Sequence, residues 1–138
     1  MKAITIISLL TLGICLLGAV SVTACEEPNI LEVTHNYNID AGEKRVISIV
    51  LERNDRLDLT ITVIGNDSGS TSTPALGGDI GIQVNDPSGQ AAVPFTRVES
   101  GNFIVLAEEN GVYVVTLDNS YSIFTPKSVT LVMRYPER

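Results

Sequence analysis

The clearest strand in the sequence reads Leu57-Asp58-Leu59-Thr60-Ile61-Thr62-Val63. Its apolar residues occupy every second position, and successive side chains of an extended chain point to opposite faces. A strand with this pattern covers a core with one face and meets solvent with the other. The stretch therefore predicts one strand of a sheet with a single buried face. The same period recurs along the chain on both sides of it.

Seven more strands are predicted from short apolar or alternating segments that turn residues separate. These segments are 31–39, 45–52, 80–84, 91–95, 103–107, 112–117 and 129–135. β-Branched residues are abundant beyond residue 24 and alanine is scarce there, which favours strands over helices. Turns at short, regular intervals predict an all-β fold: an antiparallel β-sandwich of about eight strands in two sheets.

Two of these segments also carry a prediction about their place in a sheet. The run from Arg45 to Glu52 is almost continuously apolar, as expected of a strand that is buried on both faces. The segment 91–95 contains Pro94, which has no backbone N–H to donate. We therefore expect that segment at the edge of a sheet.

Composition limits the possible functions. The chain has 138 residues, enough for one domain, and its nine Lys and Arg against sixteen Asp and Glu give a net charge of −7. This balance excludes the basic surface of a nucleic-acid-binding protein. One His and two Cys leave no zinc-binding set and no nucleophile with a base beside it. We therefore expect no catalytic residues, no cofactor and no metal, and a protein that is not an enzyme.

The N-terminus predicts export. Residues 3–24 are uncharged and follow Lys2, as in a secretory signal peptide. They end in Ser21-Val22-Thr23-Ala24-Cys25, which resembles the lipobox of prokaryotic lipoproteins, with Val22 where leucine is commonest. The resemblance implies that residues 1–24 are removed and that Cys25 carries lipid. Cys15 would leave with the leader, and lipidation would explain the lone cysteine that remains in an exported domain.

Two alternatives to the lipid anchor stay open. The uncharged stretch would measure about 33 Å as a helix, enough for an uncleaved membrane anchor. Simple cleavage after Ala24 would instead release a secreted protein. All three readings place the domain of residues 25–138 outside the cytoplasm, and two of them tether it to the membrane.

One connection between predicted strands is unusually long. Gly65 to Gly78 is polar and small in composition, and its apolar group is Pro74-Ala75-Leu76. Loops of this length in a compact domain are often functional, although a tolerated insertion is equally consistent with the sequence. We predict that Leu76 is exposed and anchors an unidentified protein partner.

The C-terminal third carries a family resemblance. Its residues Gly111, Tyr113, Asp118, Asn119, Ser122 and Lys127 stand in the order Gly-x-Tyr, Asp-Asn, Ser and Lys before a last alternating strand. This arrangement resembles the closing strands of the GOLD (Golgi dynamics) domain. The segment Ile80 to Gly89 is also similar to the middle strand and turn of that family, and in outline the resemblance runs from Arg45 to Tyr135.

The resemblance implies a β-sandwich that acts as a protein-interaction module, here in an exported prokaryotic form. We expect this chain to work without the coiled coil, membrane span, cytosolic tail and lumenal cysteine pair of the eukaryotic cargo receptors. Vesicle-coat recruitment is therefore not carried over. The Asp118-Asn119 pair also has a physical interpretation as a self-capped corner between two core strands, because such side chains bond nearby backbone amides.

Few other residues suggest chemistry. His35, the single histidine, lies on the apolar face of the first predicted strand, and we expect a structural residue with a satisfied ring nitrogen. Asn66, Asp67 and Asp79 flank the long loop and could offer oxygen ligands to calcium. The alternative function is therefore a calcium- or glycan-binding sandwich, although the absence of tryptophan disfavours a sugar-stacking platform.

Overall fold

A computed structural model describes residues 28–65 and 78–138 of the protein. The described residues form eight strands and no helix, so none of them could cross a membrane as a long apolar helix. The strands are β1 (Ile30–Ile39), β2 (Lys44–Leu51), β3 (Arg56–Gly65), β4 (Ile80–Asn85), β5 (Ala91–Val98), β6 (Ser100–Leu106), β7 (Gly111–Asp118) and β8 (Lys127–Pro136). The predicted all-β fold is confirmed.

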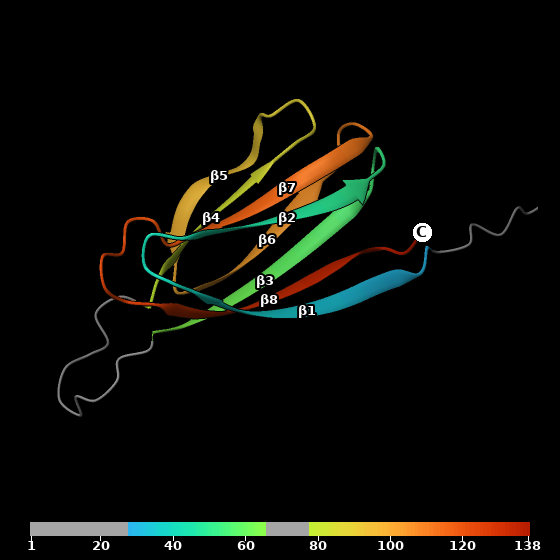
Figure 1. The fold of residues 1–138 in the computed structure, drawn as a ribbon. Coiled ribbons are helices and arrows are strands. Elements are labelled where there is room, and N and C mark those ends of the chain that lie inside the picture. The colour runs from blue at the N-terminus through green and yellow to red at the C-terminus, as the bar shows by residue number, and fades with distance from the viewer. Residues whose placement is uncertain (1–27, 66–77) are drawn as a thin grey trace, which may run out of the picture.

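The strands form two four-stranded antiparallel sheets that pack face to face (Figure 1). Sheet A has the order β1-β8-β3-β6, and sheet B has the order β2-β7-β4-β5. The first strand therefore pairs with the last, and all ten residues of β1 have partners in β8 in one unbroken register. Because the segments joined this way are far apart in sequence, the pairing ties the beginning of the domain to its end.

The core lies between the two inner faces. Leu57, Leu59 and Ile61 of β3 are at most 1% exposed, as the alternation of that strand predicts. The central strands supply most of the other core residues, which include Ile80, Ile82, Val84, Tyr113, Val115, Leu117, Val129, Leu131 and Met133. Strands in the middle of each sheet are covered on both sides by neighbours, which is why their inner residues are the most completely buried.

The prediction that the run 45–52 is buried on both faces is wrong. β2 is an edge strand of sheet B, and its outer face leaves Val46 63% and Val50 66% exposed. Ile49 and Leu51, on its inner face, are buried. The apolar run therefore reflects a strand with hydrophobic residues on both faces but a core on one. Pro94, in contrast, does lie on an edge strand, β5.

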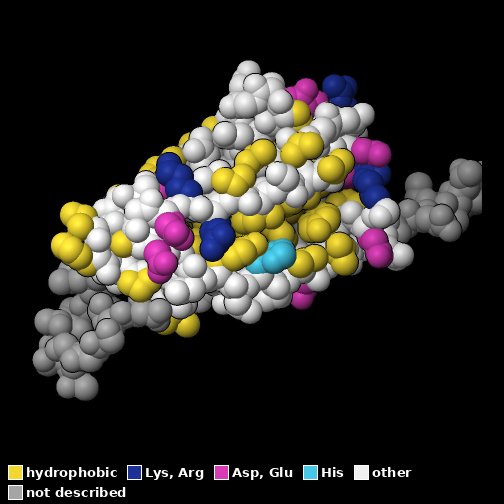
Figure 2. Space-filling model, viewed as in Figure 1, with side chains coloured by type: hydrophobic (Ala, Val, Ile, Leu, Met, Phe, Trp, Pro, Cys, Tyr) yellow, Lys and Arg dark blue, Asp and Glu magenta, His cyan; other side chains and the backbone are white. Residues whose placement is uncertain are grey.

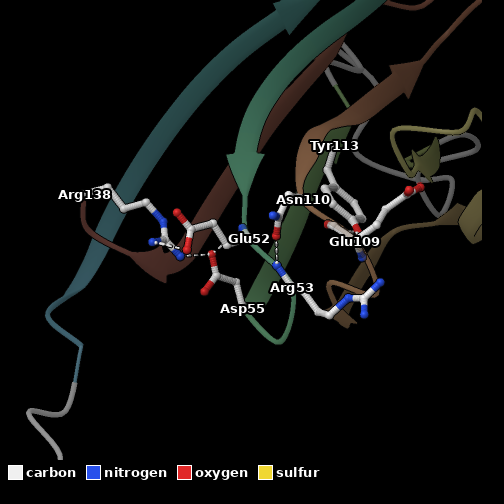
Figure 3. Close-up of polar contacts among 7 residues, drawn as sticks. All are labelled: Glu52, Arg53, Asp55, Glu109, Asn110, Tyr113 and Arg138. Atoms are coloured by element: carbon white, nitrogen blue, oxygen red, sulfur yellow. Dashed lines mark hydrogen bonds and ion pairs between the residues drawn. The ribbon is translucent and has the colours of Figure 1, made fainter.

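The two ends of the sandwich differ. The end that holds both described termini, here called the proximal end, is closed by a hydrogen bond from the Glu137 N–H to the Asn29 C=O. There Arg138 forms ion pairs with Glu52 and Asp55 of the β2–β3 turn (Figure 3). The side-chain oxygen of Asn110 accepts a hydrogen bond from the backbone of the same turn. These contacts fix the turn against the C-terminus and the β6–β7 connection.

Candidate functional site

The opposite, distal end of the sandwich holds most of the residues singled out by the sequence. There β7 ends and the segment 119–126, here called the distal loop, leads into β8. The β1–β2 turn and the first residue of β4 lie at the same end, because Lys44 and Gly81 are both register partners of Asp118. The distal loop therefore bridges the two sheets.

Asn119 holds the distal loop in place. Its side-chain Nδ2 lies 3.1 Å from the C=O of Ile39, 3.1 Å from that of Asp40 and 3.0 Å from that of Thr125. Its backbone N–H donates to Glu43, and its C=O accepts from Gly42. One buried side chain thus joins the end of β1, the β1–β2 turn and the far end of the distal loop. Its Oδ1 is also buried and has no hydrogen-bond partner.

Asp118 lies on the outer face of sheet B, next to Asn119. Its carboxylate forms an ion pair with Lys44 at 2.7 Å and accepts a 2.7 Å hydrogen bond from the Ser120 N–H. Burial raises the pKa of Asp118, but the hydrogen bonds from Lys44 and Ser120 outweigh it, so the pKa lies below its ordinary value. The ionised carboxylate therefore caps the first turn of the distal loop.

The second half of the distal loop is also braced. The hydroxyl of Ser122 donates to the C=O of Thr125 and accepts from its N–H. Lys127, the first residue of β8, is 2% exposed and lies opposite Ile39 of β1. The two serine bonds close a tight turn just before the chain enters the core, so the tip between them has a defined shape.

A second cluster supports the loop from sheet B. The Arg97 guanidinium lies 3.8 Å from the centre of the Tyr121 ring and forms an ion pair with Asp79. The Tyr121 hydroxyl donates a 2.7 Å hydrogen bond to the Asp79 C=O. Burial and the Asp79 carboxylate both raise the pKa of Tyr121. Sequence analysis missed this cluster, because its members are separated along the chain and belong to no local pattern.

The tip of the distal loop presents two large hydrophobic side chains to solvent. Ile123 is 78% exposed and Phe124 is 89% exposed, the highest values among the large hydrophobic residues of the described chain. Figure 2 shows hydrophobic side chains at this end of the molecule. Ser122, Thr125 and Tyr121 hold the residues on either side, so the pair projects from a braced base. The sequence carries a signal for this site, because an Ile-Phe pair lies between turn residues.

The other predicted residues lie elsewhere. Gly111 and Tyr113 are at the proximal end, where the Tyr113 hydroxyl accepts a 3.1 Å hydrogen bond from the Glu108 N–H and donates to the Glu109 C=O (Figure 3). Tyr113 is 1% exposed. Cys25 and Leu76, the predicted lipidation and partner-binding residues, lie outside the described residues.

The structure places His35 and the proposed calcium ligands as follows. The ring of His35 stacks on Tyr37, with ring centres 5.5 Å apart, so its described contact is a structural one on β1. Asp79 is engaged by Arg97, while Asn66 and Asp67 lie outside the described residues. In the segments 28–65 and 78–138, no three acidic, His or Cys residues gather as a metal site would require.

Comparison with known proteins adds a family. The model of the emp24/gp25L/p24 family/GOLD matches residues 34–137, most of the chain, and confirms the resemblance found in the sequence. No curated protein matches. Among solved structures, the chain is similar to a subunit from Bacillus described under "Bacillus endospore appendages form a novel family of disulfide-linked pili". The identity is 16% and the TM-score 0.48, with 81% of this chain and 92% of that chain covered.

The chain is also similar to Aeromonas hydrophila PliG, a periplasmic lysozyme inhibitor of g-type lysozyme. There the identity is 11% and the TM-score 0.39, with 77% of this chain and 87% of that chain covered.

Proposed function

The chain belongs to the emp24/gp25L/p24 family/GOLD, and on that premise we propose that it is a non-catalytic protein-interaction module that works outside the cytoplasm. The observation that carries the proposal is the exposed pair Ile123 and Phe124 on the braced distal loop. Large hydrophobic side chains that project from a fixed base are typical anchors of protein interfaces, because their burial in a partner costs little additional ordering.

The anchor pair is supported by what surrounds it. The distal loop is fixed by the buried amide of Asn119 and by the Arg97–Tyr121 contact, so the tip keeps one shape in the absence of a partner. Asp118 and Asp79 are both engaged in ion pairs and are not available as an acid or base pair. The geometry of this end therefore favours binding over catalysis.

A photo-crosslinking experiment tests the interaction site. A photoreactive phenylalanine analogue at position 124 should crosslink a partner in native membranes, whereas the same analogue at Val46 should not. Both side chains are exposed, but Val46 lies on the flat outer face of β2 rather than on the loop. The double variant I123S/F124S should lose that partner and keep its melting temperature. Crosslinking of equal yield and identity from both positions would contradict a specific distal site.

We propose further that Cys25 tethers the domain to the membrane through lipid, as its resemblance to a lipobox implies. Two acyl signals give stable anchoring, and a lipidated N-terminal cysteine supplies them. The wild-type protein should incorporate labelled fatty acid, and Cys25→Ala should not, while the domain still folds. Absence of label in the wild type would leave the uncleaved anchor or the secreted form.

Leu76 is the second proposed contact, in the connection between β3 and β4. The strand ends on either side of that connection, Gly65 and Ile80, lie at the distal end, since Gly65 is the register partner of Lys127. Replacing residues 68–76 by a short Gly-Ser linker should then weaken capture of the partner that position 124 crosslinks. An unchanged yield would remove Leu76 from the site and leave the distal loop as the anchor.

A further inference from the structure

The sandwich is open along one side, between its edge strands β1 and β2. The inner residues Leu31, Val33, His35 and Tyr37 of β1 are all half-buried, whereas Val129, Leu131 and Met133 of the neighbouring β8 are at most 2% exposed. Figure 2, which shows this side, has hydrophobic side chains on both walls of a furrow with the histidine among them. We call this the β1–β2 furrow: Leu31, Val33, His35, Tyr37, Ile47 and Ile49.

A cavity lies at the proximal end of the furrow. It has a volume of about 400 Å³ and lies between Leu31 of β1, Ile49 and Val50 of β2, and Tyr135 with the last residues of the chain. Its position between two strands of different sheets shows that β1 and β2 do not close over the core. The cavity, whose lining also includes Ser48, Glu137 and Arg138, has room for a bulky side chain that neither strand supplies.

The free edge of β1 determines what kind of occupant fits. The Glu137 N–H bonds the Asn29 C=O, and alternate residues of a strand direct both backbone groups to the same side. The odd residues of β1 therefore bond β8. The even residues, Ile30, Glu32, Thr34, Asn36 and Asn38, direct theirs to an edge with which no described strand pairs.

β1 carries few of the features by which natural edges avoid pairing. It is ten residues long, without proline, lysine or a register shift, and Glu32 is its one charged residue. The edge of β2 begins in contrast with Lys44 and Arg45. An added strand is therefore favoured along β1, where its alternate side chains would cover the furrow.

The charge of Arg45 indicates which side chain the bound segment should carry. Arg45 lies two residues before Ile47, on the inner face of β2 at the distal end of the furrow, and forms no ion pair with the described residues. Figure 2 shows a basic side chain beside the histidine. In a protein of net charge −7, an unpaired cation at the wall of an apolar furrow fits an acidic group of the occupant.

We propose that the β1–β2 furrow accepts an extended segment of another protein, which pairs with β1 as a fifth strand of sheet A. The segment has apolar side chains at alternate positions, a bulky one in the proximal cavity and an acidic group at Arg45. This surface is separate from the distal tip and goes beyond the interaction proposed there.

Synthetic strands test the proposal. The probes are two fluorescent ten-residue peptides of alternating threonine and valine or leucine, with glutamate first or last to cover both strand directions. One of them should raise its fluorescence anisotropy with the purified protein. N-methylation of the alternate amides on one peptide edge should abolish binding, and methylation of the other edge should not, because one edge faces β1. Equal binding of the two methylated forms, or no binding of either probe, overturns the proposal.

Protein variants test the same contact from the other side. Arg45→Glu should weaken binding about tenfold and should recover it when the probe's glutamate is replaced by lysine. Arg53→Glu, at an exposed arginine of the proximal turn, is the matched control and should change nothing. Thr34→Pro removes an N–H of the free edge without removing a bond to β8, and should weaken binding at an unchanged melting temperature.

Two further results distinguish this site from the distal loop, and a foreign partner from a second copy of the chain. The variant F124S should bind the probe as the wild type does, which separates a failure here from a failure of the distal site. A concentration-dependent dimer of the protein alone that Thr34→Pro abolishes would show that the occupant is a second copy, and would overturn the proposal.

Discussion

Asn119 joins three segments of the fold through one buried side chain. Its Nδ2 contacts carbonyls of β1, the β1–β2 turn and the distal loop, and its replacement removes the side-chain bonds that hold these three segments together. We expect Asn119→Ala to lower the free energy of unfolding by about 2–4 kcal/mol. Ser122→Ala, which removes bonds within the loop alone, should cost about 1 kcal/mol. Urea unfolding measures both, and equal costs would contradict the role of Asn119 as the link between sheets.

Asp118 should make stability depend on acid. Its pKa is lower in the folded than in the unfolded chain, so its charge stabilises the fold above the ordinary carboxyl value of about 4. That contribution is lost as the pH falls through the lowered folded pKa. We expect Asp118→Asn to cost about 1 kcal/mol at pH 7 and progressively less below pH 4. Thermal melting of both proteins across this range gives the difference, and a gap that widens in acid would refute the assignment.

The sequence predicts the hydrogen bonds between neighbouring residues of the Asp118-Asn119 corner, but not those to residues far away in the chain. An Asp-Asn pair followed by serines implies bonds to nearby amides, and the Ser120–Asp118 bond is of that kind. The partners Ile39 and Asp40 lie 80 and 79 positions before Asn119, and only the pairing of β1 with β8 and of β2 with β7 brings them close. The Arg97–Tyr121–Asp79 cluster could not be predicted for the same reason: its residues are distant in sequence and are brought together by strand pairing.

At the level of strands, alternation predicts which face of a strand is inward but not whether the strand is central. β2 is an edge strand with one neighbour and β3 is a central strand with two, yet the outer faces of both are exposed, with Val46 at 63% and Ile64 at 62%. Strand order depends on long-range pairing, which periodicity does not encode. The proline of β5 did reveal an edge, because a missing N–H is a local property.

The exposed outer face of β2 makes a direct prediction. Val46→Thr should change the free energy of unfolding by less than about 0.5 kcal/mol, because the side chain is 63% exposed. Ile49→Ala, on the inner face of the same strand, should cost about 2–5 kcal/mol. Chemical denaturation of the two variants gives the comparison, and a large cost at position 46 would mean that something covers the outer face of sheet B.

The start of β7 requires glycine. Gly111 has φ +150°, and a Cβ there would lie 2.6 Å from the Pro87 Cγ of the β4–β5 turn. We expect Gly111→Ala to cost about 1–3 kcal/mol, from strain and from displacement of that turn. Gly42→Ala is the matched control, since Gly42 has φ +84° but open space around it, and should cost about 1 kcal/mol. Differential scanning calorimetry compares them, and a smaller loss at position 111 than at 42 would rule out the steric contribution.

Considered whole, the molecule separates its proposed tether from its proposed anchor residues. Asn29 and Glu137 are bonded at the proximal end, whereas Ile123 and Phe124 belong to the loop at the opposite end of β8 (Figure 1). A ten-residue strand such as β8 extends about 33 Å. The sequence predicted a leader, a sandwich and a long loop, but the relative placement of tether and tip follows from strand direction and pairing, which only the assembled sheets define.

This separation can be measured with lipidated protein in vesicles that contain a quenching lipid. If Cys25 holds the domain at the membrane, β1 starts only a few residues away at Ile30, so the proximal end stays near the surface and the tip stands roughly the length of a strand above it. A fluorophore at Arg53 of the proximal turn should be quenched strongly, and one at Phe124 weakly. The tip is then free to bind a protein facing the membrane. Strong quenching at Phe124 with little at Arg53 would instead mean that the hydrophobic tip itself enters the lipid, and the distal loop would be a membrane contact rather than a protein-binding one.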